Sequence, residues 1–183
     1  MLSLAAHRAR GACYGFALSA FLAVMSPPAM ATSAAVSSSI EEANRAAVAR
    51  SFEAWRTGTG SPYDLLAPDA QWTITGNSAA ARTYPSRDAF IDEVIRPFNA
   101  RMQARLVPVV RKIYAEDDTV IVFFDAAGTA RDGKPYTNTY VWILEMDNGR
   151  IVRANAFFDS IEFDDLWGRV KLAQGSAGGG TNP

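Results

Sequence analysis

The sequence predicts an α+β fold in which a curved, cone-shaped antiparallel sheet wraps around N-terminal helices. Apolar residues recur with a helical period up to Met102 and with a period of two from Arg105 onward. Two tight-turn signals, Asp132-Gly133 and Asn148-Gly149, join long β-rich runs. Because a sheet with one apolar face needs cover, and the amphipathic helices are the cover available, we expect the sheet to curl around them and leave a cleft.

The first predicted elements are a helix, a helical turn and a short strand. Residues 39–42 have the spacing of a capping box, and apolar residues follow at helical spacing. This pattern predicts a helix over 40–56, which Gly58 ends. The next segments predict a single helical turn at residues 62–66 and a short strand at 71–75.

A second long helix and four strands make up the rest of the predicted domain. Ser86 can cap a helix that continues to Met102, and Pro97 should kink or restart it. The predicted strands that follow cover residues 105–115, 119–131, 135–147 and 150–162. A short helix over 163–170 completes the domain.

The N-terminus has the three-part layout of a secretory signal. Basic residues precede an uncharged stretch over 11–25, and Ala29-Met30-Ala31 supplies small residues just before a cut after Ala31. The sequence therefore predicts a signal peptide over 1–31 and a periplasmic or secreted mature protein. The rest divides into a flexible linker over 32–38, one domain over 39–171 and a flexible tail over 172–183.

Composition excludes several kinds of site. Removing residues 1–31 takes away the only His, the only Cys and two of the 18 basic residues, which leaves 16 basic against 19 acidic residues. Catalytic triads with His or Cys, disulfides and thiolate or imidazole metal sites are then excluded, so a general base would be a carboxylate or, failing that, a Lys or Tyr. The acidic balance argues against a nucleic-acid partner. We expect no membrane span in the mature chain, no metal and no cofactor.

Three segments carry a resemblance to a known family: Trp72-Thr73-Ile74-Thr75-Gly76, Pro135-Tyr136-Thr137-Asn138-Thr139-Tyr140 and Ala156-Phe157-Phe158-Asp159. With the order of elements, they resemble the nuclear transport factor 2-like superfamily, in its SnoaL-like branch, over residues 40–170. The resemblance implies a cystatin-like roll and a catalytic aspartate at Asp159. The superfamily includes ketosteroid isomerases, polyketide cyclases, epoxide hydrolases and proteins without catalysis. The ketosteroid isomerase tyrosine and aspartate fall on Ser51 and Ile74, which argues against that particular chemistry.

Asp159 is the candidate general base. It follows the apolar residues Phe157 and Phe158 and faces the same way as Phe157. If that side of the strand is the cleft, desolvation raises the carboxyl pKa and makes Asp159 a usable base toward a C–H acid. The alternative is an aspartate at the strand end that caps the helix starting near Phe163 or meets water.

The strand over 135–147 presents an amide, a phenol and an indole on one face, from Asn138, Tyr140 and Trp142. Asn138 or Tyr140 would stabilise an oxyanion by hydrogen bonds while Asp159 removes a proton. The expected ligand contacts are Trp72, Trp142, Phe157 and Asn155. They include Phe157 and Asn155 because we take their side of the last strand as equivalent to the side of Tyr140. The alternative is that these alternating aromatics are ordinary core.

Three functions stay open at this point. The leading hypothesis is a cofactor-independent isomerase, cyclase or lyase that acts on a small hydrophobic carbonyl compound. The second is a module that binds the same kind of ligand without transforming it. The third is a structural protein that forms a homodimer through an exposed sheet face, expected at Val141, Ile143, Val152 and Ala154. Spacing does not decide whether Asp125 faces the cleft or that dimer contact.

Overall fold

A computed structural model of the chain describes residues 29–172, with side chains from Ser37 onward. Most of the predicted signal peptide and nearly all of the predicted tail lie outside the described residues. Within them, no helix has both the length and the apolar character needed to cross a bilayer.

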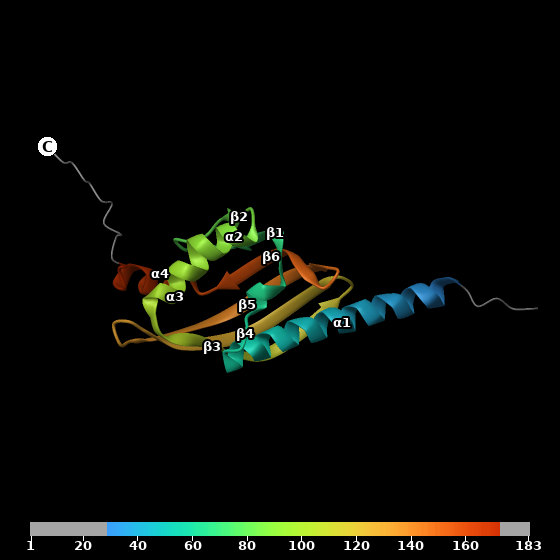
Figure 1. The fold of residues 1–183 in the computed structure, drawn as a ribbon, viewed down its shortest axis with the longest axis horizontal. Coiled ribbons are helices and arrows are strands. Elements are labelled where there is room, and N and C mark those ends of the chain that lie inside the picture. The colour runs from blue at the N-terminus through green and yellow to red at the C-terminus, as the bar shows by residue number, and fades with distance from the viewer. Residues whose placement is uncertain (1–28, 173–183) are drawn as a thin grey trace, which may run out of the picture.

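The helices and short turns are six in the described part of the chain: α1 (Ala29–Thr57), η1 (Pro62–Leu65), α2 (Arg87–Phe90), η2 (Ile91–Ile95), α3 (Arg96–Arg101) and α4 (Ser160–Arg169). The strands are β1 (Leu66–Ile74), β2 (Thr83–Tyr84), β3 (Met102–Glu116), β4 (Thr119–Ala130), β5 (Pro135–Asp147) and β6 (Arg150–Phe158). All six strands form one curved sheet in the order β2-β1-β6-β5-β4-β3 (Figure 1). The α+β architecture predicted from the sequence is confirmed.

Strands β3 to β6 form the predicted antiparallel meander. The turn between β5 and β6 has positive φ at both Asn148 and Gly149, as a type I′ hairpin requires. The sheet is nevertheless mixed, because β1 runs parallel to β6. The prediction of a purely antiparallel sheet is corrected there, and the two-residue strand β2 was not predicted at all.

Helix α1 begins at Ala29, earlier than the predicted start at residue 40. Residues 32–38, predicted as a flexible linker, are helical and continue into the predicted helix. Figure 1 shows the N-terminal part of α1 extending past the end of the sheet. Cleavage after Ala31 stays a prediction.

The second predicted helix is interrupted as Pro97 suggested. Ser86 caps α2, its side chain accepting a hydrogen bond from the Ala89 N–H at 3.2 Å. A π-helical turn, η2, then joins α2 to α3, which starts with Pro97 in its first turn. Proline has no N–H to donate to the previous turn, and a π-turn is one way a helix accommodates such a break. Val94 of this turn is buried in the core, and Ile91 and Ile95 pack against it.

The helical cover is divided between two places on the inner face of the sheet. Helix α1 packs on β3 and β4, where Val48 and Phe52 are fully buried against Val122 and Phe124. Helix α2 packs on the same face over β1, which lies toward the opposite edge of the sheet. Aromatic side chains lie between these two covers, with the Phe52 ring 4.9 Å from Phe124 and 5.5 Å from Trp142. The middle strands are covered mainly by these aromatic side chains, and β5 also contacts α4.

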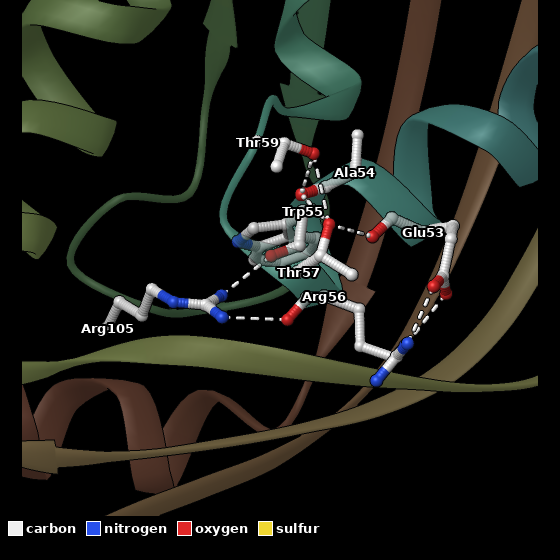
Figure 2. A network of polar contacts seen from close by, with 7 residues as sticks. All are labelled: Glu53, Ala54, Trp55, Arg56, Thr57, Thr59 and Arg105. Carbon is white, nitrogen blue, oxygen red and sulfur yellow. Dashed lines mark hydrogen bonds and ion pairs between the residues drawn. The ribbon is translucent and has the colours of Figure 1, made fainter.

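The end of α1 is fastened to β3 by Arg105. Its guanidinium donates hydrogen bonds of 2.7 Å to the main-chain carbonyls of Trp55 and Arg56 (Figure 2). Gly58 ends the helix with a φ of +78°, and a Cβ there would lie 3.3 Å from the Arg105 guanidinium carbon. Glycine is thus required at position 58 by backbone conformation and by the close approach of the arginine.

The matched changes Gly58→Ala and Gly133→Ala separate these two requirements. Both residues have positive φ, but a Cβ at Gly133 meets nothing within 4 Å. Gly133→Ala should lower the free energy of unfolding by about 1 kcal/mol through backbone strain alone. Gly58→Ala should cost more, about 2 kcal/mol, because it also displaces Arg105 from the helix end. Urea unfolding measures both, and equal costs would contradict the role given to Arg105.

Candidate functional site

A cavity of about 610 Å³ lies between the inner face of the sheet and the helices. Nine aromatic residues line it: Trp55, Tyr63, Trp72, Phe90, Phe98, Tyr140, Trp142, Phe158 and Phe163. Four polar residues, Ser61, Asp64, Asn99 and Arg105, complete the lining and are called the mouth below, since all but the half-buried Ser61 are exposed. A cavity of this size and character suits a small organic molecule.

The rings form a connected wall with defined geometry. Trp72 and Phe90 stack with ring centroids 4.4 Å apart, and Trp142 meets Trp72 edge to face at 5.0 Å. Trp55 stacks on Trp142 from the end of α1 at 6.0 Å. Because each ring is fixed by its neighbours, the wall offers a preformed set of flat surfaces.

The phenols of Tyr63 and Tyr140 line the cavity, and Tyr136 contacts Tyr140 from outside it. The hydroxyls of Tyr140 and Tyr136 lie 3.0 Å apart, and Asn138 Nδ2 donates to the Tyr136 hydroxyl at 3.1 Å. Burial, followed by the influence of Tyr136, raises the pKa of Tyr140 well above its ordinary value. Burial also raises the pKa of Tyr63, again with a contribution from Tyr136. Both cavity phenols therefore stay neutral and act as hydrogen-bond donors rather than bases.

Asn138 has a structural role in place of the predicted catalytic one. Its Nδ2 donates to the main-chain carbonyl of Asp159, and its Oδ1 accepts from the N–H groups of Asp159 and Thr139. With Tyr136 as a second acceptor, both donors and the acceptor of the amide are in use. Asn138 is also not among the cavity residues. It extends the sheet ladder past the end of β6, so the prediction that it stabilises an oxyanion directly is corrected.

Asp159 lies outside the cavity and is exposed. Strand β6 ends at Phe158, earlier than predicted, and Asp159 is the N-cap of α4, accepting a hydrogen bond of 2.9 Å from the Ile161 N–H. This is the alternative role weighed from the sequence, a helix cap that meets water. The carboxylate borders a second, shallower hollow of about 360 Å³, with Asp125 and Glu162. Its candidacy as a base inside the cavity is therefore not supported by its position.

The predicted ligand contacts divide by strand. Trp72 and Trp142 line the cavity as predicted, and the indole N–H of Trp72 is buried without a hydrogen-bond partner in the described part of the chain. Phe157 and Asn155 do not line it, because β6 presents Ala156 and Phe158 to the cavity instead. Phe157 pairs with Val141 on the outer face of the sheet and is 40% exposed. The equivalence assumed between the faces of the last two strands was wrong by one residue.

The outer face of the sheet contains Asp125 and part of the predicted dimer surface. Asp125 lies there, hydrogen-bonded to Thr139 and paired with Arg111, and the pKa of its carboxyl is lowered by the Thr139 hydrogen bond and by Arg111. Val141 and Ile143 lie on the same face, as the dimer hypothesis expects. Ala154 is fully buried on the inner face, so it is removed from the predicted contact surface. The homodimer itself stays a prediction.

Three mouth and wall residues were missed as site residues by sequence reasoning. Trp55, Tyr63 and Arg105 line the cavity, and none of them was among the predicted site residues. For Tyr63 a signal exists in hindsight, since Ser61 and Asp64 form a capping box that presents the ring from a short 3₁₀ turn. Nothing in the local sequence signals that Arg105 reaches the end of α1. Among residues 37–172, no group of three or more His, Cys, Asp or Glu is arranged to hold a metal ion.

The curved sheet, its divided helical cover and the cavity between them define an α+β roll. The SnoaL-like domain family matches residues 40–154, more than half of the chain, and the protein therefore belongs to this family. The family resemblance inferred from the sequence is confirmed. No curated protein matches the chain.

Solved structures show the same fold at low identity. An NTF2-like protein from Burkholderia thailandensis E264 is 23% identical, with a TM-score of 0.57, over 68% of this chain and 96% of that one. A putative SnoaL-like polyketide cyclase from Jannaschia sp. CCS1 is 19% identical, with a TM-score of 0.54, over 68% and 90%. TerC, co-crystallised with polyporic acid, is 21% identical, with a TM-score of 0.56, over 68% and 97%. At these identities the likeness establishes the fold and not the activity.

Substitutions at Asn138 and Asp159 test the structural parts given to them. Asn138→Ala should lower the free energy of unfolding by about 2 kcal/mol, because it removes the partners of Asp159 and Tyr136. Asp159→Asn should change it by less than about 0.5 kcal/mol, since asparagine caps a helix as well as aspartate does. Urea unfolding measures both. A larger loss for Asp159→Asn than for Asn138→Ala would contradict this assignment.

The buried phenols predict a loss of stability at alkaline pH. Tyr63, Tyr136 and Tyr140 all have a pKa raised by burial in the folded state. Above pH ~10 the unfolded chain releases these protons and the folded chain does not, so unfolding becomes easier by up to about 1.4 kcal/mol per pH unit for each group. Stability is full below that pH and falls as pH rises.

Unfolding free energies between pH 8 and 11 measure this slope. Tyr140→Phe should make the decrease of unfolding free energy with pH less steep, by the contribution of one tyrosine. Phe124→Leu is the matched control, because Phe124 stacks on Tyr140 at 4.8 Å but has no proton to release. It should lower stability equally at every pH. A Tyr140→Phe slope identical to that of the unchanged protein would contradict the predicted titration.

Proposed function

We propose that this protein binds a small, flat, largely apolar compound that carries a carbonyl or similar oxygen acceptor. One observation carries the proposal: the cavity is walled by rings and contains neutral phenol donors, while the carboxylates near it lie at its mouth or outside it. Flat apolar walls with few polar groups bind such ligands through stacking and oriented hydrogen bonds.

Hydrogen bonding inside the cavity favours an acceptor on the ligand. The Tyr140 hydroxyl has the Tyr136 hydroxyl as its one partner in the described structure, and the Trp72 indole N–H has none there. A buried hydrogen-bond donor without a partner destabilises the folded protein, and a ligand oxygen that accepts its hydrogen bond removes this cost. A ligand that stacks on the wall and accepts from Tyr140 or Tyr63 therefore satisfies both kinds of contact.

Binding without chemistry is favoured over proton transfer, because Asp159 is exposed outside the cavity and Asp64, the one carboxylate among the described lining residues, is at the mouth. A second candidate, a cofactor-independent isomerase or cyclase, is favoured by one specific observation. Asp64 is at the mouth, and the neutral phenols of Tyr63 and Tyr140 are suited to stabilise a developing oxyanion. Relatives in the fold include a putative polyketide cyclase and a protein co-crystallised with polyporic acid, which agrees with either candidate.

We further propose that the protein acts after export, as the N-terminal sequence predicts, and that the outer face of the sheet forms a homodimer. Neither step alters the cavity, which is enclosed by elements of one chain. Both are open to direct measurement by N-terminal sequencing of the mature protein and by light scattering.

Ligand binding is tested with two aromatic probes that differ in one oxygen. 2-Acetonaphthone carries a carbonyl, and 2-ethylnaphthalene has the same ring without it. Tryptophan fluorescence reports occupancy, since Trp55, Trp72 and Trp142 line the cavity. The ketone should bind more tightly than the hydrocarbon, and Tyr140→Phe should weaken the ketone alone by roughly fivefold, as expected for one hydrogen bond of about 1 kcal/mol.

The control is Tyr114→Phe, the same change at an exposed tyrosine on β3 that is outside the cavity. It should leave both affinities unchanged. Saturable binding of neither probe would contradict the proposed function.

Proton exchange distinguishes the two candidate functions. In deuterium oxide, an enzyme with a base at the mouth would speed deuterium incorporation into the methyl group beside the ketone, and Asp64→Asn would abolish that rate. A binding protein would hold the ketone without accelerating exchange, which is the outcome we expect from the placement of the carboxylates.

A further inference from the structure

Arg105 brings a positive charge to the mouth of the cavity, and it is the only cationic side chain among the cavity residues of the described structure. It projects from β3 and is exposed. Figure 2 shows its guanidinium lying beside the end of α1, next to Trp55, whose ring forms part of the cavity wall. The charge therefore stands where a ligand would enter.

The guanidinium is held in place without being neutralised. Two main-chain carbonyls, of Trp55 and Arg56, accept hydrogen bonds of 2.7 Å from its two terminal nitrogens. A guanidinium has five N–H groups, so donors remain for a further acceptor. No acidic side chain of the described residues forms a salt bridge with it.

Neighbouring arginines show the contrast. Arg82 pairs with Glu93, Arg87 with Asp88 and Arg96 with Asp92. Arg56, which follows the cavity residue Trp55, pairs with Glu53, and Figure 2 shows its side chain directed away from Arg105. Each of these arginines forms a salt bridge with an acidic side chain, whereas Arg105 forms none with the described side chains. Its charge is therefore available to a ligand.

The other charged residue of the mouth, Asp64, is directed toward the backbone. Its carboxylate accepts a hydrogen bond of 2.8 Å from the Ser61 N–H in the capping box of η1. A carboxylate used as a cap interacts favourably with the partial positive charge of the helix start. Asp64 thus has a hydrogen-bonding role within η1, and the acid and amide probes described below measure whether Arg105 or Asp64 governs the charge of the ligand.

We propose that the ligand carries a carboxylate that pairs with Arg105 at the mouth while its aromatic part fills the cavity. This inference rests on the proposed function and adds the charge of the ligand to it. An anchored guanidinium suits a carboxylate because it presents parallel N–H donors that are already oriented, so less freedom is lost on binding.

The test uses 2-naphthylacetic acid, ionised at pH 7, and its neutral amide, 2-naphthylacetamide. Tryptophan fluorescence titrations of the whole protein should give an affinity for the acid about tenfold above that for the amide. The preference should shrink as sodium chloride rises from about 0.02 to 0.5 M, because added salt screens an exposed pair. These two measurements need no substitution and so do not depend on how variants fold.

Arg105→Gln should remove the preference, weakening the acid about tenfold and leaving the amide unchanged. Arg105→Lys should keep part of it, since the charge remains but the fork is lost. The matched control is Arg56→Gln, the same change at a paired arginine outside the cavity, which should leave both affinities unaltered.

The possible results separate the two proposals. If neither compound binds, the proposed function fails. If both bind equally, or if Arg105→Gln and Arg56→Gln reduce acid binding alike, the cavity is confirmed as a binding site and the inference about Arg105 is overturned. Tighter binding of the amide than of the acid would also overturn it, and would assign control of the mouth to Asp64.

Discussion

The structure depends on how the inner face of the sheet is covered. Helix α1 covers β3 and β4 and α2 covers β1, which leaves a gap between these two helices, and α4 contacts β5. Aromatic side chains from both sides reach into that gap, with Trp55 against Trp142 and Phe90 against Trp72. Rings are rigid and meet in a few preferred geometries. They line the gap without filling it, and the cavity is the result.

The same cover determines the electrostatics of the cavity. Its interior contains little that solvates charge, so ionised groups are excluded and the phenols of Tyr63 and Tyr140 keep their protons. Carboxylates are placed where water or backbone N–H groups meet them, as Asp159 is at the start of α4 and Asp64 at the start of η1. A site of this kind is better equipped to donate hydrogen bonds than to remove protons. This explains why ring contacts and donors, rather than a base, characterise the pocket.

Sequence patterns predicted what is determined locally. Asn148-Gly149 forms its turn with positive φ at both residues, whereas in the Asp132-Gly133 turn only Gly133 has positive φ. Ser86 identifies a helix start through one side-chain acceptor. Alternation also separated the two faces of β6 correctly. It could not show which face meets the inner face of β5, because that depends on register, and a shift of one residue exchanges the faces. Phe157 was therefore assigned to the cavity in place of Phe158, and Asp159 with it.

Long-range contacts account for the rest of what the sequence did not show. Arg105 is separated by about fifty residues from the carbonyls it binds, and no local pattern relates them. The contact exists because Gly58 turns the chain sharply after Trp55 and leaves room for the guanidinium. One residue thus fastens α1 to the sheet and supplies charge to the mouth. Since the carbonyls take only part of its donors, the proposed ligand contact does not compete with this structural role.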